Sequence, residues 1–195
     1  VMGNNDTFEV TERREECVKH FRMPDGSYIA VQYEIPVHYL DESNHWQDID
    51  NTLSASGSEY QTSTARVKFA KNTKASKTVF LKGEDYQLSF GLIGANQSKI
   101  AVMENPEIAE HDSAATKFER LSTLTKLISK VQYANAYLNT DIEYVLVGNN
   151  IKENIVIKCP TVGDYQYSFE LKVNNLTANL NEDGSISIIN NNTQK

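Results

Sequence analysis

The chain has 195 residues, a formal net charge of −7 at pH 7, 39% hydrophobic and 23% charged residues, and ten tyrosines against one tryptophan. This length fits one domain, or two small ones that share a face. The acidic balance argues against nucleic-acid binding, since such domains carry basic patches. We find no run of 18 apolar residues, so we expect no membrane span.

The first third of the chain predicts antiparallel hairpins. Residues 17–23 and 28–33 both alternate between two sets of side chains, and Pro24-Asp25-Gly26-Ser27 separates them. Alternation on both sides of an Asp-Gly pair is a strong local hairpin pattern.

A second hairpin is expected directly afterwards. Pro36 interrupts the alternation, as proline does at a strand edge. Residues 37–40 and 46–50 then flank Asp41-Glu42-Ser43-Asn44, in which Asn44 tolerates a left-handed backbone conformation.

The rest of the chain is mostly strand-like. Residues 54–64 are rich in Ser and Thr, and we expect a loop there. Further strands are expected at 66–70, 78–81, 86–92, 99–103, 132–137, 142–147, 151–158, 165–173, 176–181 and 185–189.

Residues 114–130 differ, because apolar side chains recur there at steps of three and four. That spacing favours a helix over an irregular connection. The predicted fold class is therefore mainly β, an antiparallel β-sandwich or twisted double sheet with one helix around 114–130. We expect one β-rich domain over 1–195, divisible into sub-lobes 1–103 and 131–190, and a fragment of a larger protein.

Two groups of segments carry a family resemblance. The first is Val18-Lys19-His20-Phe21, Asp25-Gly26-Ser27-Tyr28, Pro36-Val37-His38-Tyr39, Trp46 and Ile49-Asp50-Asn51-Thr52-Leu53. The second is Val131-Gln132-Tyr133, Asp141-Ile142-Glu143-Tyr144, Ile151-Lys152-Glu153-Asn154-Ile155, Phe169 and Asp183-Gly184.

In this order the segments resemble the N-terminal, non-repeat region of very large secreted RHS/YD-repeat, wall-associated and related surface proteins of Gram-positive bacteria, especially clostridia. The resemblance is dense at the two ends of the chain and loose over 54–130. It implies a secreted or cell-surface location and a scaffold or binding role. It implies no catalytic residue.

Histidines and carboxylates are the first candidates for chemistry. His20 and His38 lie in the hairpins and, with Asp48 or Asp50, have the donor types of a metal site. Packing between strands, or a place on the solvent-exposed face, also explains these histidines and is the interpretation we favour, so we assign no metal and no cofactor.

Other polar groups point to structure. Alternation places Asp141 and Glu143 on one strand face, which predicts a solvated face. Asp41-Glu42-Ser43-Asn44 lacks the later Glu of a calcium loop and is expected to be a plain turn. Cys17 and Cys159 either pair or remain two buried thiols.

Aromatic residues of the hairpins are the candidate binding residues: Trp46, Tyr39, Tyr28 and Tyr33. Exposed rings stack on sugars and anchor protein partners, whereas buried ones serve the core.

The leading functional hypothesis is a non-catalytic structural or adhesion module of a bacterial secreted or cell-surface protein. Its expected partners are the rest of a larger polypeptide and, in addition, a cell-wall glycan or a protein. The alternatives are a carbohydrate-binding module, which needs an exposed aromatic platform, and a cell-wall hydrolase, which needs two close carboxylates or a metal between histidines.

Overall fold

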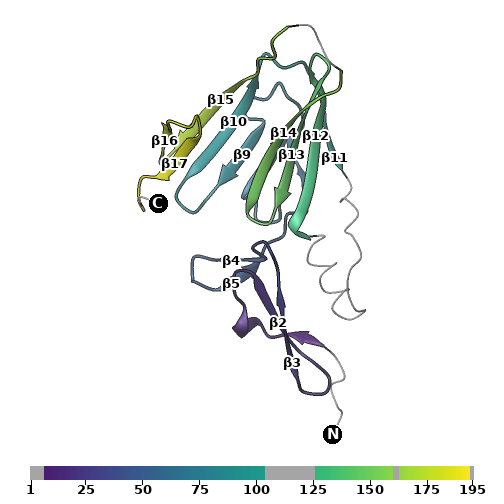
Figure 1. Ribbon diagram of the computed structural model, residues 1–195, viewed down its shortest axis with the longest axis vertical. Coiled ribbons are helices and arrows are strands. Elements are labelled where there is room, and N and C mark those ends of the chain that lie inside the picture. Colours follow the sequence, from purple (N-terminus) through teal and green to yellow (C-terminus); the bar gives the residue numbers. More distant parts are fainter. Residues whose placement is uncertain (1–6, 104–125, 160–162, 194–195) are drawn as a thin grey trace. The chain divides into compact units, whose positions relative to one another are not determined.

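The computed structural model describes residues 7–103, 126–159 and 163–193, and these residues form a mainly β structure with several antiparallel sheets (Figure 1). The predicted fold class is confirmed. The chain divides into two compact units. Unit 1 comprises Val1–Asn51, Asn105–Ser129 and Leu146–Ile151, and unit 2 comprises Thr52–Glu104, Lys130–Val145 and Lys152–Lys195. This division differs from the expected sub-lobes 1–103 and 131–190.

Unit 1 contains the predicted hairpins. One sheet has the order β1-β2-β3, with β1 at Phe8–Glu9, β2 at Val18–Arg22 and β3 at Tyr28–Gln32. A short 3-10 helix at Thr11–Arg13 lies between β1 and β2 in the sequence. The second hairpin pairs β4 (His38–Leu40) with β5 (Trp46–Asp48).

The two turns of unit 1 have the conformations that their sequences predict. Gly26 has a φ of +84°, and Asn44 has a φ of +59°, so both adopt left-handed backbone geometry. The carboxylate of Asp41 accepts hydrogen bonds from the backbone N–H groups of Ser43 and His45. The Asp41 segment is therefore the expected plain turn, closed by its own first side chain.

The core of unit 1 collects one face of each hairpin with part of a distant segment. Its buried side chains are Phe21, Val31, Tyr33, Val37, Ile49 and Leu127. Asn51 connects the same segments through polar contacts. Its side-chain amide donates to the carbonyl oxygens of Leu127 and Gly148, both at 2.8 Å, and its own carbonyl accepts the hydroxyl of Ser129 at 2.6 Å.

The larger sheet of unit 2 has six strands in the order β15-β10-β9-β8-β7-β6. Their bounds are β6 Ser54–Ser56, β7 Glu59–Gln61, β8 Val67–Ala70, β9 Val79–Lys82, β10 Gln87–Ile93 and β15 Ser168–Asn174. The expectation of a loop over 54–64 was wrong for residues 54–56 and 59–61, which are strands, whereas residues 62–64 lie outside any strand. β6 and β7 form a hairpin, because Gly57 supplies the positive φ (+54°) that the tight turn needs and β8 pairs with β7.

A second sheet has the order β11-β12-β13-β14, with bounds Ile100–Met103, Ile128–Tyr137, Thr140–Val147 and Asn150–Ile157. Within unit 2 the two sheets face each other through aromatic rings. The ring of Tyr144 on β13 lies 5.7 Å from that of Phe69 on β8 and 5.8 Å from that of Phe90 on β10. The Tyr133 hydroxyl on β12 donates to the Ala70 carbonyl at 2.6 Å.

The expected helix around 114–130 is corrected at its carboxyl end, where residues 128–130 belong to β12. Over residues 128–133, buried and half-buried side chains alternate, which is the pattern of a strand with one face in the core. Residues 114–125 lie outside the described residues.

The last hairpin joins β16 (Leu176–Leu180) to β17 (Ile186–Asn190) in a two-stranded sheet. Its base is attached to the turn between β9 and β10. The side-chain amides of Asn190 and Asn192 donate to the carboxylate of Asp85 at 2.8 and 2.6 Å, which lowers the pKa of Asp85.

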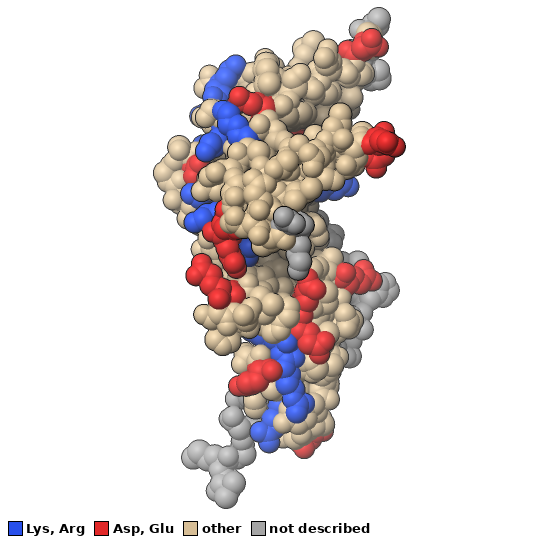
Figure 2. Space-filling view, turned by 90° about the vertical axis from the view of Figure 1, so that its left-hand side faces the viewer, with Lys and Arg blue, Asp and Glu red and all other residues tan. Residues whose placement is uncertain are grey.

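On the face shown in Figure 2, Lys and Arg side chains are interspersed with Asp and Glu. Within the described residues, no helix has the length and apolar character needed to cross a membrane. Cys17 and Cys159 are both free thiols, the first half-buried and the second exposed.

Candidate functional site

Five charged or titratable side chains of unit 1 converge between the two hairpins, and we call Glu9, Arg14, Lys19, His38 and Asp48 the ion cluster. Arg14 contacts both acids. Its Nε lies 2.7 Å from Glu9 Oε1, and its Nη2 lies 2.8 Å from Asp48 Oδ2. Lys19 Nζ lies 2.6 Å from Asp48 Oδ1 and 3.6 Å from Glu9 Oε2.

The secondary structure explains why these residues meet. Glu9 belongs to β1, Lys19 to the neighbouring strand β2, and His38 lies directly opposite Asp48 in the β4–β5 pair. Residues directly opposite in an antiparallel pair have side chains on the same face. The cluster therefore joins one side chain from each of four strands, with Arg14 added from the segment that follows the 3-10 helix.

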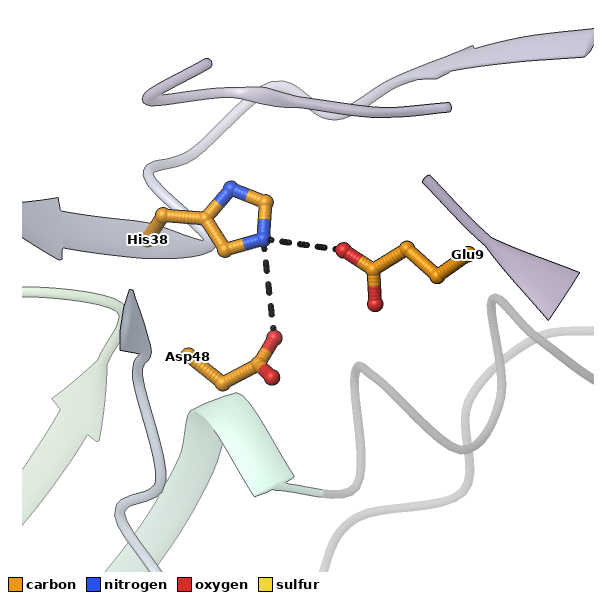
Figure 3. A group of neighbouring side chains, drawn as sticks. All are labelled: Glu9, His38 and Asp48. Atoms are coloured by element: carbon orange, nitrogen blue, oxygen red, sulfur yellow. Dashed lines mark ion pairs between the residues drawn. The ribbon is translucent and has the colours of Figure 1, made fainter. Parts of the chain in front are cut away.

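His38 is the most buried member, with a side chain that is 0% exposed. Its Nδ1 lies 2.6 Å from the backbone carbonyl oxygen of Glu15. A carbonyl only accepts hydrogen bonds, so Nδ1 carries a proton. The other nitrogen, Nε2, points between the two carboxylates, 3.5 Å from Glu9 Oε1 and 3.5 Å from Asp48 Oδ1 (Figure 3).

The pKa of Glu9 reflects these contacts. Burial by itself would raise the pKa, but the contacts with His38 and Arg14 and the positive charges of Lys19 and Arg14 outweigh burial and lower it from 4.5 to about 2. The hydrogen bond to Glu9 in turn raises the pKa of Arg14. Glu9 and Arg14 are therefore both charged throughout the neutral range.

The donor set of a metal site is present in part. Glu9, His38 and Asp48 each offer a ligand atom, and these atoms lie within 4.8 Å of one another. A histidine that donates Nδ1–H to a backbone carbonyl and turns Nε2 toward carboxylates has the orientation usual for a metal ligand.

The charges of the cluster oppose that use. The acceptor oxygens Glu9 Oε1 and Asp48 Oδ1 already receive hydrogen bonds from Arg14 and Lys19, respectively. Two carboxylates and two permanent cations sum to zero, so a divalent ion would enter a site whose negative charge is already neutralised. The geometry fits an internal ion network that holds four strands together better than it fits a metal centre.

The predicted aromatic residues take different positions in unit 1. The Tyr28 side chain is exposed (51%) and lies under the Arg13 guanidinium, whose carbon is 4.7 Å from the ring centroid. Tyr33 is 6% exposed and belongs to the core, and Tyr39 packs against that core. Trp46 is half-buried, with its ring centroid 6.5 Å from that of His38. Of the four, only Tyr28 has an exposed side chain, and one face of its ring is covered by Arg13. A binding role for the four stays a prediction.

The histidines and acids that the sequence analysis grouped as candidate metal ligands do not all lie together. His20 does not join His38, because its Nε2 lies beside the exposed carboxylate of Glu15 at 3.2 Å. Asp48 does join His38, as one of the sequence-based pairings proposed. Sequence reasoning missed Glu9, Arg14 and Lys19, although one signal existed. Lys19 falls on the same strand face as Phe21, and a lysine on an apolar face indicates a buried partner.

Asp141 and Glu143 share a strand face as predicted, since Gln132 lies within hydrogen-bonding distance of both carboxylates. The expected solvated face was wrong. Both residues are buried, and each forms an ion pair at 2.8 Å, Asp141 with Lys158 and Glu143 with Lys130. Burial raises the pKa of Asp141, and the hydrogen bond from Lys158 more than reverses that effect. These ion pairs connect neighbouring segments of one sheet, and through them the carboxylates of both Asp141 and Glu143 are neutralised.

The depressed pKa of Glu9 leads to a pH prediction. A carboxylate with a folded pKa near 2 and an unfolded pKa near 4.5 stabilises the fold fully above pH 4.5, and this contribution is lost as the pH falls toward 2. After allowance for the 19% exposure of the side chain, we expect Glu9→Gln to lower the free energy of unfolding at pH 7 by about 2 kcal/mol.

The measurement is urea unfolding followed by the fluorescence of Trp46, the single tryptophan, which belongs to unit 1. The difference between wild type and E9Q should shrink steadily between pH 4.5 and 2. A difference that stays constant over this interval would contradict the assignment.

Comparison with known proteins adds no relative: no family model, no curated protein and no solved structure matches this chain.

Proposed function

We propose that this chain is a non-catalytic structural or adhesion module of a larger bacterial secreted or cell-surface protein. The ion cluster is the observation that supports this most directly. Among the described residues of unit 1, it is the place where a histidine and two carboxylates meet, and there Arg14 and Lys19 bind both acids. The resemblance of the two groups of segments to surface proteins of Gram-positive bacteria is the ground for the proposed cellular setting.

The chemistry of the cluster argues for a structural role. A general acid or base works best when its pKa lies near the working pH. Glu9 has a pKa of about 2 and therefore has no proton to give to a leaving group at neutral pH. Asp48 is held by two cations at 2.8 Å or less, which makes its carboxylate an acceptor for structural hydrogen bonds.

The first test is an assay of hydrolysis with the purified chain. Cell-wall glycan, cross-linked peptidoglycan and an unfolded peptide substrate are incubated with wild type, E9Q and D48N. We expect no product above the level of the buffer control for any of them. Product formation by wild type that disappears in folded D48N would overturn the proposal in favour of a hydrolase.

The second test concerns location. Cells that produce the parent protein are separated into culture medium, cell-wall and cytoplasmic fractions, and each is probed with an antibody raised against this chain. We expect the signal in the medium or the cell-wall fraction. A signal confined to the cytoplasm would contradict the proposed setting and leave the structural role to be judged by the hydrolysis assay.

A further inference from the structure

Strand β15 forms one edge of the six-stranded sheet of unit 2 (Figure 1). It pairs with β10 along its whole length, from Ser168 opposite Ile93 to Asn174 opposite Gln87. Beyond it, β16 and β17 pair with each other in a separate sheet. Among the described residues, no other strand pairs with the outer edge of β15, so its backbone offers a row of donors and acceptors to another strand.

The side chains of β15 divide into an apolar and a charged face. Phe169, Leu171 and Val173 alternate on one face, and Leu171 and Val173 are 39% and 38% exposed. Glu170 and Lys172 lie on the other face and form an ion pair with each other at 2.9 Å, with side chains that are 52% and 47% exposed. The strand has seven residues and no proline, so each of them can take part in backbone pairing.

The order of these residues is self-complementary. In an antiparallel pair of identical strands related by a two-fold axis at Leu171, each residue faces the one that lies equally far on the other side of Leu171. Glu170 of each copy then faces Lys172 of the other, so two opposite-charge pairs form. Phe169 faces Val173 in the same way, and the two Leu171 side chains face each other. Every charged position has an opposite charge and every apolar position has an apolar partner.

We propose that β15 is a self-association edge, through which a second copy of this chain extends the six-stranded sheet by antiparallel pairing about Leu171. Strand addition of this kind draws its affinity from backbone hydrogen bonds and its register from the facing side chains. Two copies of the parent protein would thereby be held together through their unit 2 sheets, which goes beyond the structural or adhesion role proposed above.

β14, an edge strand of the four-stranded sheet, lacks this property. Lys152 and Glu153 are adjacent on β14 and therefore lie on opposite faces, so no two-fold register brings one opposite the other. A two-fold axis at Ile155 would instead set Lys152 opposite Lys158, a repulsive pair. Of these two edge strands, only β15 has a charge pattern that is complementary to itself, and this pattern makes a second copy of the chain its occupant.

The test is a charge swap measured by sedimentation velocity at low ionic strength, where exposed charges are least screened. E170K sets two lysines against each other in both symmetric pairs, and K172E does the same with two glutamates. We expect each single variant to raise the dimer dissociation constant at least about tenfold. The double variant E170K/K172E restores both pairs, and we expect it to associate like wild type.

Mixing provides the sharpest control. When E170K and K172E are combined in equal amounts, every charged position of one chain faces the opposite charge of the other. We expect the mixture to form heterodimers, although each variant alone is mostly monomeric. K152E on β14 serves as the matched control on the other edge, and we expect it to leave association unchanged. Thermal unfolding of all variants checks that these exposed substitutions leave the fold intact.

A wild-type chain that stays monomeric up to about 1 mM would overturn the proposal. It would also be overturned if single variants dimerise like wild type, if the mixture fails to associate, or if K152E weakens association as strongly as E170K. None of these results bears on the hydrolysis assay, so failure of this proposal leaves the proposed function standing on its own test.

Discussion

Tyr144→Ala should lower the free energy of unfolding of unit 2 by about 3–5 kcal/mol, the range for truncation of a large buried aromatic side chain. Tyr144 is 0% exposed, and its ring packs against Phe69, Phe90 and Tyr133 at centroid distances of 5.7, 5.8 and 6.3 Å. Its removal opens a cavity between the two facing sheets, because rings from both sheets lose a contact. Urea unfolding followed by far-UV circular dichroism measures the effect.

Tyr144→Phe measures the contribution of the hydroxyl to stability separately from that of the ring. The hydroxyl donates to Glu153 Oε1 at 2.6 Å, and we expect its loss to cost about 1–2 kcal/mol at pH 7. Burial raises the pKa of Glu153, and the hydrogen bond from Tyr144 opposes that rise. The Phe variant should therefore raise the pKa of Glu153 further, and its deficit in stability should narrow as the pH falls and Glu153 takes up a proton.

Tyr28→Ala is the matched control, since Tyr28 is 51% exposed and its main contact is with the Arg13 guanidinium. We expect a loss below about 1 kcal/mol. A loss for Tyr144→Ala as small as that for Tyr28→Ala would contradict the packing of the two sheets through this ring.

Asn51→Ala should destabilise unit 1 by about 3 kcal/mol, because it removes two buried hydrogen bonds made by one amide. Asn51 is 6% exposed and donates to the carbonyl oxygens of Leu127 and Gly148, 76 and 97 residues away in the sequence. Leu127 keeps a second donor, the N–H of Gly148 at 3.0 Å, so the Gly148 carbonyl bears most of the loss. Trp46 fluorescence during urea unfolding reports on this unit.

Asn51→Asp gives a stricter test at nearly constant volume. It sets a carboxylate against two carbonyl oxygens, so we expect a greater loss than for Asn51→Ala at pH 7. The loss should decrease at acidic pH, where a protonated carboxyl donates one hydrogen bond. Asn181→Ala, which removes an exposed amide that donates to Ser185 and Ser187, should change stability by less than about 1 kcal/mol. Because Asn181 belongs to unit 2, far-UV circular dichroism follows the unfolding of this control. Equal effects at positions 51 and 181 would refute the role given to Asn51.

Local patterns predicted local structure well. The Asp-Gly turn, the left-handed Asn44 and the last hairpin all depend on residues within about four positions of one another, and the structure contains each of them. The loop expected over 54–64 was wrong because Ser and Thr are common to exposed strands and loops. Burial could not distinguish the two, since β6 is exposed along its length.

The ion cluster shows the limit of that approach. Alternation placed Lys19 on the apolar face of its strand, and β4 and β5 were expected to pair, so a contact between His38 and Asp48 was within reach. The sequence could not predict that Glu9 and Arg14 join this contact, because β1 has only two residues and shows no periodicity. Burial opposes the low pKa of Glu9, which results from the contacts with His38 and Arg14 and from the charges of Lys19 and Arg14, and no spacing in the sequence encodes these distances.

The sequence by itself determined the mainly β class, the hairpins and their turns, because these follow from alternation and from residues that accept a positive φ. The tertiary structure alone decided the sheet order, which places β15 beside β10 across more than 70 residues, and with it the free edge of the larger sheet. It also decided that Asn51 donates hydrogen bonds to residues 127 and 148. The two hairpin histidines have different partners, because His20 lies beside the exposed carboxylate of Glu15 and His38 lies in the ion cluster. Partner choice between distant strands depends on packing and desolvation summed over the whole unit, whereas a turn depends on the few residues that form it.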